Sequence, residues 1–186
     1  MVPSSAGGAV REMRRWLLAG LLLGFACGAQ GFLGGEGLPP WWYQRTGLPP
    51  EVVAVLPIED PVRVLFVFVY LDDRALRSNL RPERMRVVEE YQGKNALLVW
   101  AYSQFPVRFE PDAFRFFQGE REIPVVERIN VDGDFLGGRI VPGQPAAAVY
   151  LLAEAFDPGE PLTITYGPSL KATMALTPSQ EDALAP

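Results

Sequence analysis

The segment 130–134 is the part of the sequence most similar to a metal-binding loop. Its residues, NVDGD, place oxygen-bearing side chains alternately before a glycine, as calcium loops do. If Gly133 takes the sixth position of such a loop, the first position falls on Arg128 and the twelfth on Arg139. Guanidinium groups then stand where carboxylates are required. We therefore expect an Asp-Gly turn between strands, with neither a metal ion nor another cofactor.

Positive charge is concentrated in the segment 72–86, whose sequence is DDRALRSNLRPERMR. A cluster of guanidinium groups can contact a phosphate, anionic lipid headgroups or the acidic surface of a protein. The alternative is a solvent-exposed loop that Asp72, Asp73 and Glu83 partly neutralise. The residues that we take as possible partner contacts are Arg74, Arg77, Arg81, Arg84 and Arg86.

Three adjacent aromatic residues, Trp41, Trp42 and Tyr43, form the second candidate surface. Leaving three large rings in water is unfavourable, so the simplest expectation is that they pack over the edge of a domain. A membrane-interface belt and a platform that stacks on sugars are the alternatives. A carbohydrate-binding module would also need Trp100 and Tyr102 to be exposed, although the strand face that these two residues share could equally be core.

The composition disfavours many catalytic arrangements. The chain has no histidine, which is the commonest general base and a common metal ligand. Its one cysteine, Cys27, lies in an N-terminal apolar stretch, so the remainder has no thiolate nucleophile, disulfide or zinc cluster. These features favour a protein that is not an enzyme.

Residues 1–29 have the pattern of a secretory signal. Arg14 and Arg15 precede the apolar stretch WLLAGLLLGFA and the small residues CGA, and Met13 is a suitable start. We expect cleavage after Ala29, with a retained signal anchor or lipidation at Cys27 as alternatives. The protein would then be exported to the periplasm, the cell envelope or the extracellular space.

The charge of the remaining chain is acidic. Without residues 1–29, which hold three arginines and one glutamate, the formal net charge changes from −5 to −7. Binding of nucleic acid needs clustered positive charge, so an acidic protein argues against it. A length of 186 residues, 48% of them hydrophobic, suits one folded domain.

The chain after the signal divides into three parts. Residues 30–50, QGFLGGEGLPPWWYQRTGLPP, are rich in glycine and proline and predict an extended linker or arm. Residues 51–176 contain short apolar runs between turn signals, which predicts an all-β, immunoglobulin-like antiparallel β-sandwich of about eight strands. Residues 177–186 are expected to form a flexible tail.

Several strands can be placed individually. The run 62–71 is rich in β-branched and aromatic residues, so we expect a central strand that is buried on both faces. Residues 85–91 and 96–102 flank the segment QGKN and predict a hairpin, with Gly93 at positive φ. The other expected strands are 114–117, 123–129, 146–152, 162–166 and 170–176.

A family resemblance is carried by five short elements in the segment 96–176. They are Phe114-x-Phe116, Gly119-Glu120-Arg121, Val141-Pro142-Gly143, the run 149–152 and the run 161–166. In this order they resemble the telokin-like, immunoglobulin-fold domains of bacterial exported proteins and lipoproteins. The resemblance implies a fold and an exported location, and it carries over no catalytic or binding residue.

These observations lead to one main functional hypothesis. We expect a non-enzymatic, exported β-sandwich domain that binds or supports another component of the cell envelope, most simply a protein. Contact with a membrane is expected only through the N-terminal segment, if that segment is retained. A carbohydrate-binding module with exposed Trp and Tyr is the main alternative, and an enzyme using unusual Asp, Glu and Arg chemistry is a more remote one.

The signal pattern generates the first testable prediction. The native protein should begin near Gln30 and fractionate outside the cytoplasm, because a cleaved signal removes the arginines and the apolar stretch together. Mass spectrometry of the protein isolated from its own cells measures the N-terminus directly. An intact, unmodified N-terminus in a cytosolic fraction would contradict the prediction.

Overall fold

Strand β2 (Val64–Tyr70) lies at the centre of the fold, and six of its seven residues are buried. Val64, Phe66 and Phe68 belong to one hydrophobic core, while Leu65, Val67 and Val69 point to the opposite face and are also buried. The expected strand with two buried faces is therefore confirmed. The computed structural model describes residues 38–59, 63–153, 157 and 159–176, so the expected signal 1–29 and tail 177–186 lie outside the described residues.

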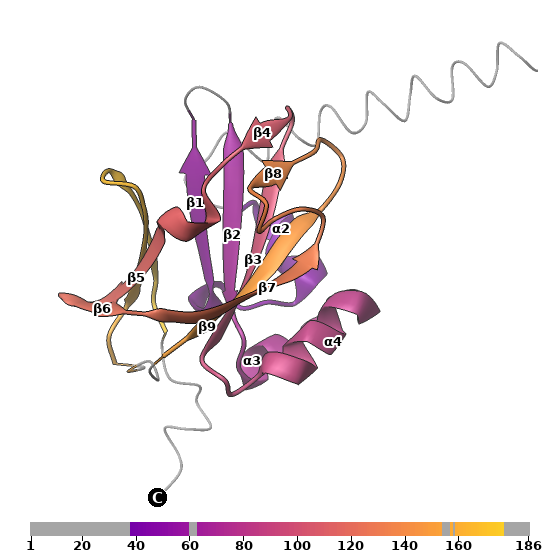
Figure 1. The fold of residues 1–186 in the computed structure, drawn as a ribbon. Coiled ribbons are helices and arrows are strands. Elements are labelled where there is room, and N and C mark those ends of the chain that lie inside the picture. Colours follow the sequence, from indigo (N-terminus) through magenta and orange to yellow (C-terminus); the bar gives the residue numbers. More distant parts are fainter. Residues whose placement is uncertain (1–37, 60–62, 154–156, 158, 177–186) are drawn as a thin grey trace, which may run out of the picture. The chain divides into compact units, whose positions relative to one another are not determined.

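Strand β2 belongs to a five-stranded antiparallel sheet with the order β1-β2-β3-β9-β7 (Figure 1). Its other members are β1 (Val53–Ile58), β3 (Ala96–Ser103), β9 (Ala146–Leu152) and β7 (Val125–Asp132). Strand β7 is at the edge, and its register with β9 shifts twice, between Val125 and Glu127 and between Asn130 and Asp132. Such bulges bend an edge strand and discourage pairing with another chain.

A second antiparallel sheet packs on one face of the first and has the order β11-β10-β5-β6. It consists of β11 (Leu170–Met174), β10 (Leu162–Tyr166), β5 (Phe114–Gln118) and β6 (Arg121–Ile123). Aromatic rings fill the space between the sheets: the Phe114 ring centroid lies 5.0 Å from that of Phe66, 5.3 Å from Phe68 and 6.0 Å from Tyr150. These edge-on contacts stabilise the sandwich-like core beyond simple burial of area.

The two sheets are joined along one side by a nearly continuous stretch of chain. Strand β6 ends at Ile123, Pro124 follows, and β7 begins at Val125 in the other sheet. Proline cannot donate a ladder hydrogen bond, which explains why the strand changes partners there. On the other side of the sandwich, β11 lies beside β1.

A third, two-stranded sheet lies near the C-terminal end of β3. It pairs β4 (Val107–Arg108) with β8 (Arg139–Ile140), and the 3-10 helix η2 (Pro111–Ala113) follows β4 (Figure 1). Gly138 lies just before β8 with φ +68°, and a Cβ there would overlap the carbonyl oxygen of Phe109. A glycine is therefore required at this close approach.

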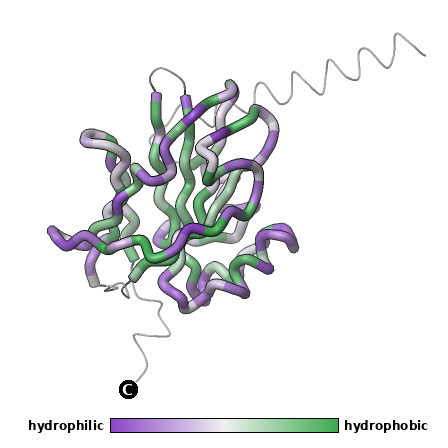
Figure 2. Tube along the Cα trace, in the orientation of Figure 1, coloured by the Kyte–Doolittle hydropathy of each residue, from purple (hydrophilic) through white to green (hydrophobic). Residues whose placement is uncertain are grey.

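Helices cover the other face of the five-stranded sheet. They are α2 (Pro40–Thr46), α3 (Asp73–Leu76) and α4 (Pro82–Tyr91), with the 3-10 helix η1 (Pro50–Val52) leading into β1. Trp42 of α2 packs edge-on against Trp100 of β3, with ring centroids 6.0 Å apart. Figure 2 shows hydrophobic residues along the central strands and hydrophilic ones in the connections. Among the described residues, no helix is long and apolar enough to cross a membrane.

The segment 38–50 is not the extended arm that we expected. Pro40 occupies the first turn of α2, and Gly47 ends the helix in the left-handed conformation with φ +66°. Both residues favour a helix at these positions, since proline loses no hydrogen bond in the first turn and glycine accepts positive φ. Leu38, Trp42 and Leu48 are buried, so this segment belongs to the folded domain.

The hairpin expected from residues 85–91 and 96–102 is wrong in its first half. Residues 85–91 lie in α4, which Pro82 starts, and Val88 is its buried residue. Gly93 does adopt positive φ (+69°), but in the connection between α4 and β3 rather than in a hairpin turn. Strands β2, β3, β5, β9, β10 and β11 fall where we expected them, and the expected strand 123–129 is divided between β6 and β7.

The second prediction tests whether α2 is an integral part of the domain. Trp42→Ala should lower the free energy of unfolding by about 3–5 kcal/mol, because it removes a buried indole and its contact with Trp100. Trp41→Ala removes the neighbouring indole, which is 48% exposed, and should cost no more than about 1 kcal/mol. Chemical denaturation measures both values, and equal losses would mean that α2 does not pack as described.

Candidate functional site

Two of the five candidate arginines stabilise the fold. The Asp72 carboxylate accepts hydrogen bonds from the backbone N–H groups of Arg74 and Ala75 at the start of α3. Its second oxygen lies 2.6 Å from an Arg74 guanidinium nitrogen and accepts from Arg74 Nε at 2.8 Å. Asp72 is thus an N-cap that also orients Arg74. Arg74 is therefore occupied in holding the start of the helix.

Arg84 is the second structural arginine. Its guanidinium Nη2 lies 2.7 Å from Oδ2 of Asp132, and its side chain is only 15% exposed. This pair joins α4 to the end of β7 through two residues that are 48 positions apart in the chain. Partial burial keeps the pair less screened than a surface ion pair, so breaking it would release the helix end.

The remaining three candidate arginines, Arg77, Arg81 and Arg86, are exposed. We call these three residues the arginine surface. They lie on or beside α3 and α4 rather than in one loop, because two short helices replace the loop that we expected. Within the part of the chain that the structure describes, neither Arg81 nor Arg86 lies in an ion pair.

Tyr102 of β3 lies close to this positive charge. Burial raises the pKa of the Tyr102 phenol, and the charges of Arg84 and Arg81 act in the opposite direction. The phenol is on the sheet face that the helices cover, since Leu98, Trp100 and Tyr102 alternate with the core residues of β3. Arg81 of the arginine surface therefore lies near the outer face of the five-stranded sheet.

The candidate aromatic residues at positions 41–43, 100 and 102 do not assemble a sugar-binding platform. Trp42 and Trp100 are 6% and 5% exposed, and they pack on each other. Trp41 and Tyr102 have 48% and 37% of their surface exposed. Burial raises the pKa of Tyr43, in keeping with its edge-on contact with Trp42 at 5.4 Å. The simplest expectation for the three aromatic residues of α2 was packing at the domain edge. Trp42 and Tyr43 pack in this way, and Trp41 is the exposed member of the three.

The calcium-like segment uses its side-chain oxygens within the turn. Asn130 donates to the carbonyl oxygen of Gly133 at 2.8 Å and accepts from the backbone N–H of Leu136 at 3.1 Å. Asp132 accepts from the backbone N–H of Gly133, which has φ +60°, and also pairs with Arg84. The expected Asp-Gly turn is present. Across the described ranges, no three acidic or thiol side chains are grouped as metal ligands.

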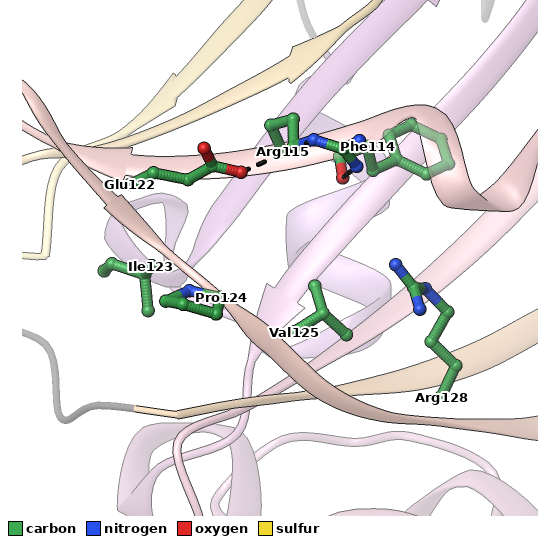
Figure 3. Close-up of a pocket in the computed structure, with 7 residues that line it drawn as sticks. All are labelled: Phe114, Arg115, Glu122, Ile123, Pro124, Val125 and Arg128. Atoms are coloured by element: carbon green, nitrogen blue, oxygen red, sulfur yellow. Dashed lines mark hydrogen bonds and ion pairs between the residues drawn. The ribbon is translucent and has the colours of Figure 1, made fainter.

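A pocket that the sequence did not indicate lies where β6 leaves β5 and becomes β7 (Figure 3). Its volume is about 280 Å³. Phe114, Ile123, Pro124 and Val125 provide apolar walls, and the charged residues are Arg115, Glu122 and Arg128. The pocket exists because Pro124 diverts the strand from one sheet to the other and leaves a wedge between β5 and β7.

Both arginines of the pocket have a carboxylate near them. Arg115 Nε lies 3.4 Å from Glu122 Oε1, and Arg128 Nε lies 3.3 Å from Asp112 Oδ1. The Arg128 Nε group is buried, yet it makes no well-directed hydrogen bond to a described residue. Each pocket arginine thus has a neighbouring carboxylate, so an anionic ligand would have to compete with Glu122 and Asp112.

Arg128 also covers the polar edge of the core. Its guanidinium carbon lies 5.6 Å from the centroid of the Tyr150 ring. The two residues are direct partners in the register of β7 with β9. Burial raises the pKa of the Tyr150 phenol well above its usual value, although Arg128 opposes this shift. The Tyr150 hydroxyl donates to the carbonyl oxygen of Pro111 at 2.9 Å. Tyr150 is therefore held as a neutral structural donor.

Comparisons with known proteins give no relative for this chain. No family model matches it, no curated protein matches it, and no solved structure matches it. The resemblance to telokin-like domains therefore stays a prediction, and the function has to be argued from the residues themselves.

Proposed function

We propose that this protein is an exported domain that binds or supports another component of the cell envelope and does not catalyse a reaction. The observation that carries the proposal is the arginine surface beside α3 and α4. Arg81 and Arg86 are exposed there and pair with none of the described carboxylates, in a chain whose formal net charge is −5.

Export is supported by the sequence of residues 1–29. Two arginines, an apolar stretch and small residues follow one another there in the order that secretory signals use. The folded part has no histidine and no cysteine, so its stability depends on packing and not on disulfides. An immunoglobulin-like relationship belongs to the same proposal, and the antiparallel pairing of two facing sheets supports it.

The arginine surface favours a protein partner with acidic groups. Arg81 precedes α4 and Arg86 lies within it, so both are held by a helix that is anchored through Arg84 and Asp132. A rigid support reduces the entropy that is lost when the guanidinium groups bind. The net charge of the chain is negative and repels an acidic partner, so a local cluster of arginines offers such a partner an attractive contact.

The carbohydrate-binding alternative loses its main support. It requires Trp42 and Trp100 to stack on a sugar, and both are buried against each other. Trp41 alone provides one exposed indole, whereas a sugar platform needs aromatic rings side by side with polar groups. The proposal therefore assigns the aromatic residues of α2 mainly to packing.

Charge reversal of the arginine surface tests the proposal. Arg81→Glu/Arg86→Glu should leave the free energy of unfolding within about 0.5 kcal/mol, because both side chains are exposed. The same variant should lose the salt-sensitive complexes that the wild-type chain forms on cross-linking in its own cell envelope. Denaturation and cross-linking followed by mass spectrometry measure the two effects.

A matched control changes the formal charge by the same amount elsewhere. Lys171→Glu/Arg121→Glu alters exposed residues on β11 and β6, in the four-stranded sheet and not on the helices that carry the arginine surface. It should retain the cross-linked complexes. If the arginine-surface variant keeps the wild-type complexes, or if the control loses them equally, the arginine surface is not the contact and the proposal fails.

A further inference from the structure

The ladder of β4 and β8 presents two arginines directly opposite each other. In its register, Val107 pairs with Ile140 and Arg108 pairs with Arg139. Ile140 is buried and Val107 packs on the core, so alternation turns Arg108 and Arg139 to the outside, where both are exposed. Val141 follows on the same outer side and is 42% exposed.

This pairing of like charges is unfavourable within the protein alone. Like charges directly across a ladder repel each other, whereas opposite charges would stabilise it. Asp134 Oδ2 lies 3.8 Å from Arg139 Nη1 and compensates only in part, since both side chains are more than half exposed. No described carboxylate forms an ion pair with Arg108. An anionic surface outside the protein would remove the repulsion.

Exposed apolar groups lie beside these arginines. Phe105, in the connection from β3 to β4, is 58% exposed. Its backbone N–H donates to the Ser103 hydroxyl at 3.2 Å, and that hydroxyl donates to the carbonyl oxygen of Arg63 at 3.0 Å. These bonds hold Phe105 next to the start of β2, where Arg63 is also exposed. We call Arg63, Phe105, Arg108, Arg139 and Val141 the basic tip.

The basic tip lies at one end of the five-stranded sheet. Figure 1 shows β4 and β8 at the end where β1 finishes and β2 begins. The described carboxylates near this end are those of Glu59, Glu110 and Asp134, and among them only Asp134 forms an ion pair with a guanidinium group of the basic tip. Most acidic residues of the domain are elsewhere, and at physiological salt charges more than about 8–10 Å away are largely screened.

We propose that the basic tip docks on a membrane surface that contains anionic lipids. Guanidinium groups beside a protruding aromatic and an aliphatic side chain are the combination that holds a peripheral protein at the headgroup layer. Single apolar side chains on connecting loops can enter that layer without a complementary groove. The described pocket lies between β5 and β7, away from this ladder, and provides no such groove here. This inference goes beyond the proposed function, because lipid is contacted by the folded domain itself.

The test uses the full-length chain, and labels at two positions distinguish docking of the basic tip from insertion of the N-terminal segment. In a Cys27→Ser background, an environment-sensitive fluorophore is attached either at Gln104→Cys, beside Phe105, or at Lys94→Cys. Both positions are exposed, and Lys94 precedes the opposite end of β3, about 25 Å away for an eight-residue strand. Vesicles contain phosphatidylcholine alone or phosphatidylcholine with phosphatidylglycerol.

The emission of the label at position 104 should shift to the blue only with vesicles that contain phosphatidylglycerol, and high salt should reverse the shift. The label at position 94 should not respond. Arg108→Gln/Arg139→Gln should need about 30-fold more lipid for the half-maximal shift, since each basic residue near an anionic leaflet contributes roughly a factor of five. Phe105→Ser/Val141→Ser should also abolish the shift, whereas Val126→Ser, which removes an exposed valine on β7, should not.

Three results would overturn the inference. One is an emission spectrum of the label at position 104 that does not shift to the blue when anionic vesicles are added. Another is an equal shift at positions 104 and 94, which would mean that only the N-terminal segment binds. The third is an unchanged lipid dependence in the Arg108→Gln/Arg139→Gln variant, which would exclude the arginines as lipid contacts.

Discussion

Burial of the central sheet on both faces is the constraint on which the structure depends. In strands β2 and β3, successive residues point to opposite faces, and Phe66, Val67, Leu98 and Val99 are all fully buried. A sheet with two apolar faces needs two covering layers, because removing each face from water is the main favourable term in folding. The second sheet covers one face with phenylalanines, and helices α2 to α4 cover the other, where Trp42 meets Trp100.

This constraint also decides where charged groups can lie. With both faces of the sheet covered, arginines are found on the covering helices, at the ends of strands and in the wedge where β6 becomes β7. Two of them stabilise the fold. Arg74 forms an ion pair with Asp72, and Arg84 of α4 forms an ion pair with Asp132 of β7. Arg77, Arg81 and Arg86 form the arginine surface, and Arg63, Arg108 and Arg139 belong to the basic tip. The proposed protein contact and the proposed lipid contact therefore use different residues.

The sequence predicted the strands better than the segments that cover them. The run that forms β2 has β-branched or aromatic residues at six of its seven positions and a leucine at the other, a composition that suits a strand covered on both faces. The hairpin prediction for residues 85–91 rests on the turn-like segment QGKN, although Pro82 and Glu83 are start signals of a helix and Met85, Val88 and Tyr91 share one helical face. The same holds for the helix at Trp42, because proline and glycine predict a linker by composition, whereas Pro40 and Gly47 mark the two ends of a helix. The pocket could not be predicted, since it depends on two sheets diverging at Pro124.

Hydrogen exchange measured peptide by peptide tests the central claim most directly. If the five-stranded sheet is covered on both faces, the amides of β2 and β3 should exchange more slowly than all others, at the rate set by global unfolding. Those of β7, an edge strand with two bulges, should exchange much faster. Exchange of β2 as fast as that of β7 would contradict the account, because it would mean that the helical layer does not hold the outer face of the sheet closed.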